Sequence, residues 1–455
     1  MNYKSSAIVA IVSILFFAGC SSVSTDTRSS QQLVKSIQVS DSSGIREYDS
    51  TAIANEVNLG KDRVLYYLNS GAASFYFNDY TKSIKQLELA EQAIEELYTE
   101  SISKGATSFL LNDNALDYSG EPYEDLYINV LKAISFLNTG SFDGAYVEVR
   151  RATNKLKELS LRTEQLIQAH NNSEDGSLYS LSNSGIYSSA LTHYLSHLIY
   201  RAEGEYDNSR ISLEKARETF ALYPSVYPFQ MPQALDSTTS TQNSHLNIIA
   251  FTGLGPIKRG VGARITSFDD FVLISDPTSY YVDAFYFPGI SAGYNFKFEF
   301  PELIPTPSEI SSIEVYADSI FLGRLELLED MNKVAIQSFE VKKRMIFFKT
   351  LIRAITKGIG AKKIGNELEE KTAPGVGCLL AGLTNVLADI SEQADLRAWS
   401  TMPGYALVGE YSILPGKYTI ELRVNDRNNQ VINRFYYDNY TINPTFNFIN
   451  LQLPW

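Results

Sequence analysis

Few residues of this chain have the type and spacing that catalysis or metal binding requires. Its 455 residues include two cysteines and four histidines. His193 and His197 stand one helical turn apart, a spacing that two zinc ligands can use, but no HExxH pattern accompanies them. Cys378 lies among apolar residues without a neighbouring histidine, which predicts a buried small side chain and not a nucleophile. The sequence therefore predicts no catalytic residue, no metal site and no cofactor.

The other cysteine, Cys20, stands where a covalent modification is expected. An apolar stretch, Ala7–Phe17, follows Lys4, and the small residues Ala18–Gly19 come directly before Cys20. This order is typical of a secretory signal peptide, here residues 1–19, and resembles the lipobox at which bacterial chains are cleaved and acylated. Each buried methylene of an acyl chain contributes about 0.8 kcal/mol, so several chains hold a protein on a membrane effectively for good.

A basic amphipathic helix is predicted between residues 342 and 363. This stretch holds eight Lys and Arg residues and no acidic residue, in a chain whose net charge is −13. Lys349, Arg353 and Lys357 recur every four residues and would share one helix face, opposite an apolar face. Such a helix can lie on an anionic membrane surface or bind an acidic partner. The alternative is a helix whose apolar face packs on its own domain while its lysines are solvated.

Composition narrows the class of protein. The net negative charge argues against a general nucleic-acid binder, because phosphate binding needs a basic surface. Hydrophobic residues make up 44% and charged residues 20%, which are values of globular domains. Beyond the signal peptide the most apolar stretch, residues 376–390, is shorter than the roughly 20 residues that a transmembrane helix needs. We expect a chain that is anchored to a membrane and does not cross it.

One short pattern occurs three times in the first half of the chain. An aromatic residue, Tyr80, Phe142 or Tyr206, follows a turn, and small, large and small residues come three, seven and ten positions later. The pattern looks like the second helix of a tetratricopeptide repeat, in which the aromatic side chain fills the junction between two helices. The aromatics are 62 and 64 residues apart, whereas tetratricopeptide units repeat every 34 or so. Extra helical pairs or long inserts would explain the difference.

The chain then divides into five parts. Residues 20–60 are polar and rich in serine, which predicts a flexible tether behind the signal peptide. Residues 61–232 have helical apolar spacing, and prolines and a polar stretch mark a linker over 233–244. Residues 245–455 alternate with period two and predict a β-sandwich-like domain with a helical insertion at about 342–398. The expected fold class is α + β: an all-α tetratricopeptide-like repeat domain followed by this sandwich.

Eight strands are predicted in the second half. They are His245–Thr252, Phe271–Ser275, Asn295–Phe300, Ser312–Tyr316, Ala335–Val341, Ala406–Ile413, Tyr418–Val424 and Thr445–Leu453.

Several motifs resemble those of one family. Gly120–Glu124, Gly140–Ala152, Gly253–Lys258 and Ala394–Trp399, the last followed by Met402–Pro403, are similar to motifs of a family of bacterial outer-membrane lipoproteins whose activity is uncharacterised. The resemblance implies a tetratricopeptide-like N-terminal half and a β-rich C-terminal half. Members often lie near genes for lipoprotein activators of penicillin-binding proteins, which implies a link to cell-wall assembly.

Charged residues within the last of these motifs are expected to serve folding. Asp395 and Arg397 predict a local ion pair, which leaves Trp399 free to pack on the sheet.

Together these features predict a lipid-anchored, non-catalytic scaffold on the outer membrane, facing the periplasm, with exposure at the cell surface left open. Its hairpins would form a groove for an envelope protein, with Tyr80, Phe142 and Tyr206 in that groove. The alternatives are a regulator of peptidoglycan synthesis, an envelope hydrolase whose residues converge only in three dimensions, and a membrane-surface-active protein that uses the basic helix.

The anchor yields a direct prediction. Wild-type protein should incorporate a palmitate label, and Cys20→Ser should incorporate none, because the acylated thiol is gone. Behind a signal peptide that an ordinary signal peptidase cleaves, the Cys20→Ser chain should appear in the soluble fraction. Cys378→Ser is the matched control and should stay labelled and membrane-bound. Mass spectrometry that found an unmodified first residue in the mature wild-type protein would contradict the prediction.

Overall fold

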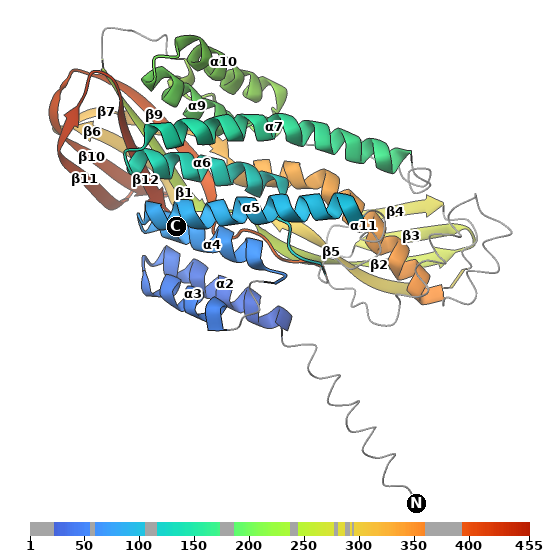
Figure 1. Ribbon diagram of the computed structural model, residues 1–455. Coiled ribbons are helices and arrows are strands. Elements are labelled where there is room, and N and C mark those ends of the chain that lie inside the picture. Colours follow the sequence, from blue (N-terminus) through green and yellow to red (C-terminus); the bar gives the residue numbers. More distant parts are fainter. Residues whose placement is uncertain are drawn as a thin grey trace, which may run out of the picture.

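Helices fill the first half of the chain and strands fill most of the second (Figure 1). The computed structural model describes residues 22–54, 60–104, 116–172, 186–236, 244–276, 281–286, 292–293, 295–359 and 394–455. Within these ranges lie nine α-helices and three four-stranded sheets, none of which closes into a barrel. The expected mixture of helices and strands is confirmed. Cys20 and Cys378 lie outside the described residues.

The helices pair along the chain. They are α2 (Ser22–Gln38), α3 (Ser43–Ala54), α4 (Arg63–Tyr76), α5 (Tyr80–Lys104), α6 (Pro122–Asn138), α7 (Phe142–Asn171), α9 (Ala190–Ala202), α10 (Tyr206–Leu222) and α11 (Met331–Ile359).

Three helical hairpins, α4–α5, α6–α7 and α9–α10, share one turn geometry. Asn78, Gly140 and Gly204 have φ angles of 60°, 77° and 78°, in the left-handed region that Gly and Asn tolerate. In each turn the next backbone N–H donates to a carbonyl five residues back, over 2.8–2.9 Å. The repeated sequence pattern therefore begins the second helix of each hairpin. Its small and large positions are all buried: Ser83, Leu87, Ala90, Ala145, Val149, Ala152, Ser209, Leu213 and Ala216.

The expected flexible tether over residues 20–60 is wrong for residues 22–54, which form α2 and α3. Leu33 and Ile37 of α2 and Tyr48 of α3 pack with Ala73 of α4 in a small apolar core. Asp49 adds polar contacts, because its carboxylate accepts hydrogen bonds from Ser70 Oγ on α4 and from Lys82 Nζ on α5. The serine content concealed this amphipathic spacing, which is why composition alone pointed to a tether.

The strands form three sheets. The first has the order β12-β1-β9-β8, the second β11-β10-β6-β7 and the third β4-β3-β2-β5. Their bounds are β1 (Ser244–Leu254), β2 (Ile257–Phe268), β3 (Phe271–Asp276), β4 (Tyr281–Tyr286), β5 (Asn295–Ile304), β6 (Ile310–Ala317), β7 (Ile320–Arg324), β8 (Glu326–Asp330), β9 (Pro403–Ile413), β10 (Gly416–Asp426), β11 (Val431–Ile442) and β12 (Asn447–Leu453). Only the β1–β12 pair is parallel among the pairings of these strands.

Strand β1 lies at the centre of a three-layer arrangement. Its alternate side chains Leu246, Ile248 and Ala250 join the apolar core between the first and second sheets. Ile249 and Phe251 point the other way, into the core beneath the helices. A strand buried on both faces carries apolar residues at successive positions, as Ile248–Phe251 do in β1. The first two sheets thus pack face to face, and the helical hairpins cover the other face of the first sheet (Figure 1).

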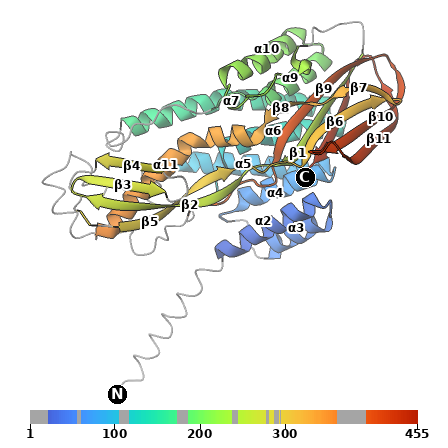
Figure 2. The ribbon, with the colours of Figure 1, turned by 180° about the vertical axis from the view of Figure 1, so that it is seen from behind.

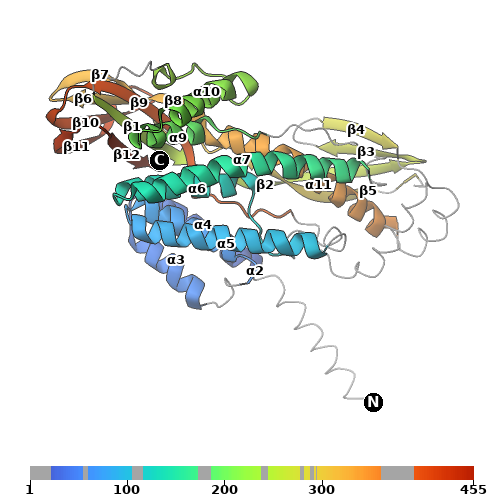
Figure 3. The same ribbon diagram turned by 45° about the horizontal axis from the view of Figure 1, so that its top comes forward.

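The third sheet and α11 form an arm that extends from this body (Figures 2 and 3). The predicted strand Ala335–Val341 is wrong, because these residues belong to α11. Asp330 Oδ1 accepts the Lys333 N–H over 3.1 Å and caps the helix, which starts earlier than the expected insertion. Buried positions Val334, Ala335 and Phe339 then follow helical spacing. None of the helices in the described part of the chain has the length and hydrophobicity of a membrane span.

Candidate functional site

Three sequence motifs that lie far apart on the chain meet where the helices contact the sheets. Glu121 and Glu124 are at the start of α6, Lys258 is at the start of β2, and residues 394–399 lead into β9. Lys342 of α11 joins them. We call this group the ionic junction; its members are Asp62, Tyr118, Glu121, Glu124, Lys258, Lys342, Asp395, Arg397 and Trp399.

Glu121 forms the ionic centre of the junction. Lys258 Nζ lies 2.6 Å from Glu121 Oε1, and Lys342 Nζ lies 2.9 Å from Oε2. The side chains of Lys258 and Glu121 are 3% and 1% exposed, so this pair is removed from water. Burial alone would raise the pKa of Glu121, but the two lysines outweigh it and hold that pKa below its usual value. The carboxylate therefore stays ionised, held between two cations.

Glu124 is held differently, by neutral donors. Its carboxylate accepts hydrogen bonds from the Tyr118 hydroxyl at 2.8 and 2.7 Å, from the backbone N–H of Glu121 at 2.9 Å and from the backbone N–H of Trp399 at 2.8 Å. The side chain is fully buried. Burial and the neighbouring Glu121 carboxylate raise the pKa of Glu124. Glu124 thus joins α6 to the segment before β9 through hydrogen bonds rather than charge pairing.

Arg397 closes the junction on its other side. Its guanidinium donates to both carboxylate oxygens of Asp395 at 2.9 Å, to Asp62 Oδ1 at 2.7 Å and to the Leu116 carbonyl at 3.1 Å. Burial would raise the pKa of Asp395, but Arg397 holds it below its usual value. The expected Asp395–Arg397 pair is confirmed, and Trp399 beside it is buried. The pair also reaches a residue next to α4, which the sequence did not indicate.

Another buried carboxylate, that of Glu329 of β8, lies outside the junction at the start of α9. It accepts the hydroxyls of Tyr127 and Tyr227, each at 2.7 Å, the Ser189 hydroxyl at 2.9 Å and the Leu191 N–H at 3.1 Å. The free N–H groups at a helix N-terminus favour an anion there. Burial nevertheless raises the pKa of Glu329, and the donors only partly oppose it. This carboxylate joins α6, α9 and the chain after α10 to the first sheet.

A buried cation links the hairpins themselves. The Lys132 side chain of α6 is 1% exposed and contacts Glu88, Glu91 at 2.8 Å and Glu148 at 3.2 Å. These carboxylates come from α5 and α7, so three helices share one charge. The sequence did carry a signal, because Lys132 interrupts an apolar run of α6. No such signal marks Glu329, whose partners lie more than 100 residues away.

The aromatic residues expected in a partner groove are not alike in the structure. Tyr80 accepts a hydrogen bond from Gln452 of β12 at 3.0 Å, and the Phe142 ring lies 5.2 Å from that of Phe446. Both contact the chain's own C-terminal segment, Tyr80 at a residue within β12 and Phe142 at the residue directly before it. Only Tyr206 is open to solvent, at 70% exposure. The three residues hold equivalent positions in their hairpins, but they do not line one open groove.

The other residues singled out in the sequence are separate from the junction. Lys349, Arg353 and Lys357 lie in α11, as expected for the basic helix, and their side chains are outside the described part of the structure. His193 and His197 are buried and bond to different partners, Ser188 Oγ and Ser209 Oγ. Burial lowers the pKa of both rings to about 4. Among the described residues no cluster of His, Cys, Asp and Glu could hold a metal ion.

Comparison of the chain with protein-family models, with curated proteins and with solved structures gave no match. The chemistry of the site therefore has to be judged from its geometry. A catalytic carboxylate must reach a substrate. Glu121, Glu124 and Glu329 are buried, and each carboxylate is occupied by the ion pairs or hydrogen bonds given above. Their arrangement is suited to fixing the helices on the sheets.

Breaking the junction should cost more stability than breaking a surface pair. Lys258→Met keeps the side-chain volume but removes a buried cation from Glu121, and we expect a loss of about 3–5 kcal/mol in the free energy of unfolding. Lys343→Met is the matched control: its contacts with Glu302 and Glu340 are partly exposed, so its loss should stay below about 1 kcal/mol. Chemical denaturation measures both. Equal losses would refute the structural role of the junction.

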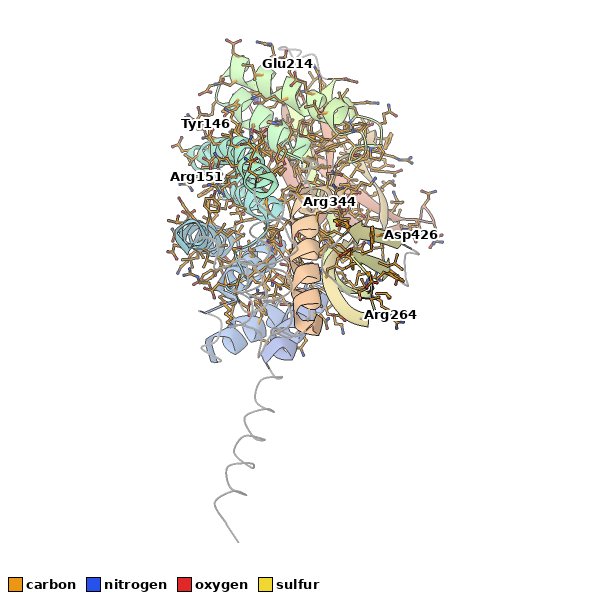
Figure 4. The ribbon with its side chains drawn as sticks, turned by 90° about the vertical axis from the view of Figure 1, so that its right-hand side faces the viewer. Tyr146, Arg151, Glu214, Arg264, Arg344 and Asp426 are labelled. Atoms are coloured by element: carbon orange, nitrogen blue, oxygen red, sulfur yellow. The ribbon has the colours of Figure 1, made fainter. Side chains whose placement is uncertain are left out.

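Glu329 predicts a pH dependence. Its pKa in the folded state is above the unfolded value of 4.5, so the folded state binds the proton first as pH falls. Stability from this group is complete below pH 4.5 and is lost as pH rises through the folded pKa. Relative to Glu329→Gln, the wild type should therefore gain stability between neutral pH and pH 4.5. Glu214→Gln, on the exposed helix α10 (Figure 4), should follow the wild type. A pH-independent difference between wild type and Glu329→Gln would contradict this assignment.

Proposed function

We propose that this chain is a lipid-anchored, non-catalytic binding scaffold of the bacterial cell envelope, held on the outer membrane through Cys20 and facing the periplasm. The observation that carries the proposal is the set of three hairpins with one turn geometry, fixed on the sheets by buried charges. Stacked hairpins offer an extended surface to a protein or peptide partner. The sequence resemblance to outer-membrane lipoproteins supports the location.

The hairpins are tetratricopeptide-like in this proposal. Each second helix begins with the aromatic residue and buries the small residues three and ten positions later, which lets the paired helix approach closely. The long spacing follows in part from helix length, because α5 and α7 have 25 and 30 residues. Helix α5 is 11 residues longer than α4 and α7 is 13 longer than α6, or about three to four turns each, so helix length supplies part of the excess over about 34 residues.

The open end of the helical layer is the best candidate for partner contact. Tyr206 is 70% exposed at the start of α10, and Val147 of the neighbouring α7 is 46% exposed. The hairpins that carry these two residues are linked to each other, because the Tyr146 hydroxyl of the second hairpin donates to Glu205 Oε1 of the third over 2.7 Å. An exposed aromatic residue on a rigid support loses little entropy on binding and is typical of interface hot spots.

The anchor would hold this surface near the membrane. Only Ser21 separates Cys20 from α2, whose apolar side chains pack on α4. A single residue spans less than about 4 Å, so the tether adds almost no reach. A partner would have to come to the membrane, as proteins of the envelope do; peptidoglycan synthases are the partners that the family resemblance implies.

A photo-crosslinking residue placed at position 206 should yield one discrete adduct in living cells, because a scaffold holds its partner at an exposed aromatic position. The same residue at Gln430, exposed in the turn between β10 and β11, is the matched control and should yield none. Denaturing electrophoresis and mass spectrometry read out both. Adducts at neither position, with normal protein levels, would count against a binding scaffold.

A further inference from the structure

The arm presents a row of exposed aromatic side chains. Phe268 of β2 pairs with Phe271 of β3, and Phe271 pairs with Tyr286 of β4. Residues in register across a sheet lie on one face, so the three rings form a row. The Phe271 and Tyr286 rings are 5.4 Å apart, and the three side chains are 49%, 48% and 59% exposed. The row lies at the far end of the arm, beside the turn between β2 and β3.

The opposite face of the same sheet is covered. Val272 and Ile274 point there and are buried, and α11 packs on this face, with the Phe347 ring 5.2 Å from that of Phe300. The aromatic row is therefore not the core of the arm. It is the outer face of a sheet whose inner face is already filled.

Helix α11 runs to the same end of the arm as the aromatic row. Lys342 lies beside Glu121 near the body, and Phe347 lies beside Phe300, which pairs with Val261. From there α11 continues for another 12 residues, or about 18 Å at 1.5 Å per residue. In β2 about 18 Å corresponds to five or six residues at roughly 3.3 Å each, which reaches the last residues before Phe268. The end of α11 is thus level with the row.

The arm is basic in an acidic chain. Residues 257–304 contain four basic and six acidic side chains, and α11 contains seven basic and one acidic, so the arm carries +4 while the whole chain carries −13. From Lys342 onward α11 has no acidic residue. Lys342 and Lys343 pair with glutamates near the body. Lys349, Arg353 and Lys357 follow nearer the far end.

The same side of the molecule carries the start of the helical layer. The first turn of α2, next to Cys20 in the sequence, and the last turns of α11 both lie on the lower side in Figures 1, 2 and 4. In Figure 4, α11 descends from Arg344 toward that side. A membrane that held the acyl chains would therefore face the end of the arm.

From these observations we infer that the far end of the arm docks on an anionic membrane surface, with Phe268, Phe271 and Tyr286 entering the interface and the basic end of α11 at the level of the headgroups. Aromatic side chains favour the membrane interface, and basic helices are attracted to anionic lipid. This inference deepens the proposed function, since it assumes a membrane beside the chain, and it names a second contact that fixes the orientation of the body.

The test uses residues 20–455 with Cys20→Ser, so that no acyl chain contributes. This protein should float with phosphatidylcholine vesicles that contain phosphatidylglycerol and much less with phosphatidylcholine alone. Lys349→Glu with Arg353→Glu should weaken binding about tenfold or more, because two attractive charges become repulsive. Phe271→Ser should weaken it to a similar extent. Binding should also fall as salt is added.

Two further variants sharpen the test, one as a matched control and one with the opposite expected effect. Phe321→Ser removes an equally exposed ring, 52% accessible, from β7 on the second sheet, and it should leave binding unchanged. Asp270→Asn removes a negative charge between the aromatic residues and suits the left-handed φ of 60°, so it should strengthen binding. Absence of flotation at low salt would overturn the inference, as would binding that ignores both the arm variants and lipid charge. Capture of a protein through Phe271 without vesicle binding would assign the arm to a protein partner and overturn it too. The anchored scaffold is tested separately, since its labelling and crosslinking do not involve the arm.

Discussion

A carboxylate that leaves water must find a cation or several donors, and this requirement fixes how the helices sit on the sheets. Apolar packing alone would tolerate small shifts between the two layers. Such shifts are not tolerated at two buried carboxylates. Glu121 lies between Lys258 and Lys342, and Glu329 lies among two tyrosines and a helix N-terminus. A shift would leave either carboxylate buried without its partners. The relative position of helices and sheets is therefore specified by a few polar contacts, and the apolar cores fill in around them.

Local patterns predicted the local structure well. The turn residue, the aromatic residue and the buried positions of each hairpin all interact within about a dozen residues, so periodicity was sufficient. Segment 335–341 was misjudged because its alternation fits a strand as well as a buried helix, and the decisive cap, Asp330, lies before it. Residues 22–38 were misjudged because serine hid their amphipathic spacing. The junction could not be assembled from sequence, since Glu124 meets Trp399 across 275 residues. Its charged residues were in view, but nothing in their spacing connects them.

The fold also has to be stable without a disulfide if Cys20 is acylated, since Cys378 would then have no thiol of the same chain to pair with. Ionic contacts between elements take part of that role. Lys132 joins three helices, Arg201 of α9 binds Glu410 of β9, and Arg397 reaches the start of α4. Each links parts of the chain that the backbone does not connect directly. The proposed scaffold would consequently present its outer surface as one rigid unit.

The parallel pairing of β1 with β12 has a consequence for how the chain acquires its structure. Leu246 faces Asn447, about 200 residues later, and both faces of β1 are apolar. Closing so large a loop is slow, because the entropy is lost before the contacts form. Until β9 and β12 pair with it, β1 exposes unpaired backbone groups and apolar side chains, which promote aggregation. If the chain is exported as proposed, it would depend on holdase chaperones in transit, and its maturation would be limited by that late closure rather than by the fast-forming hairpins.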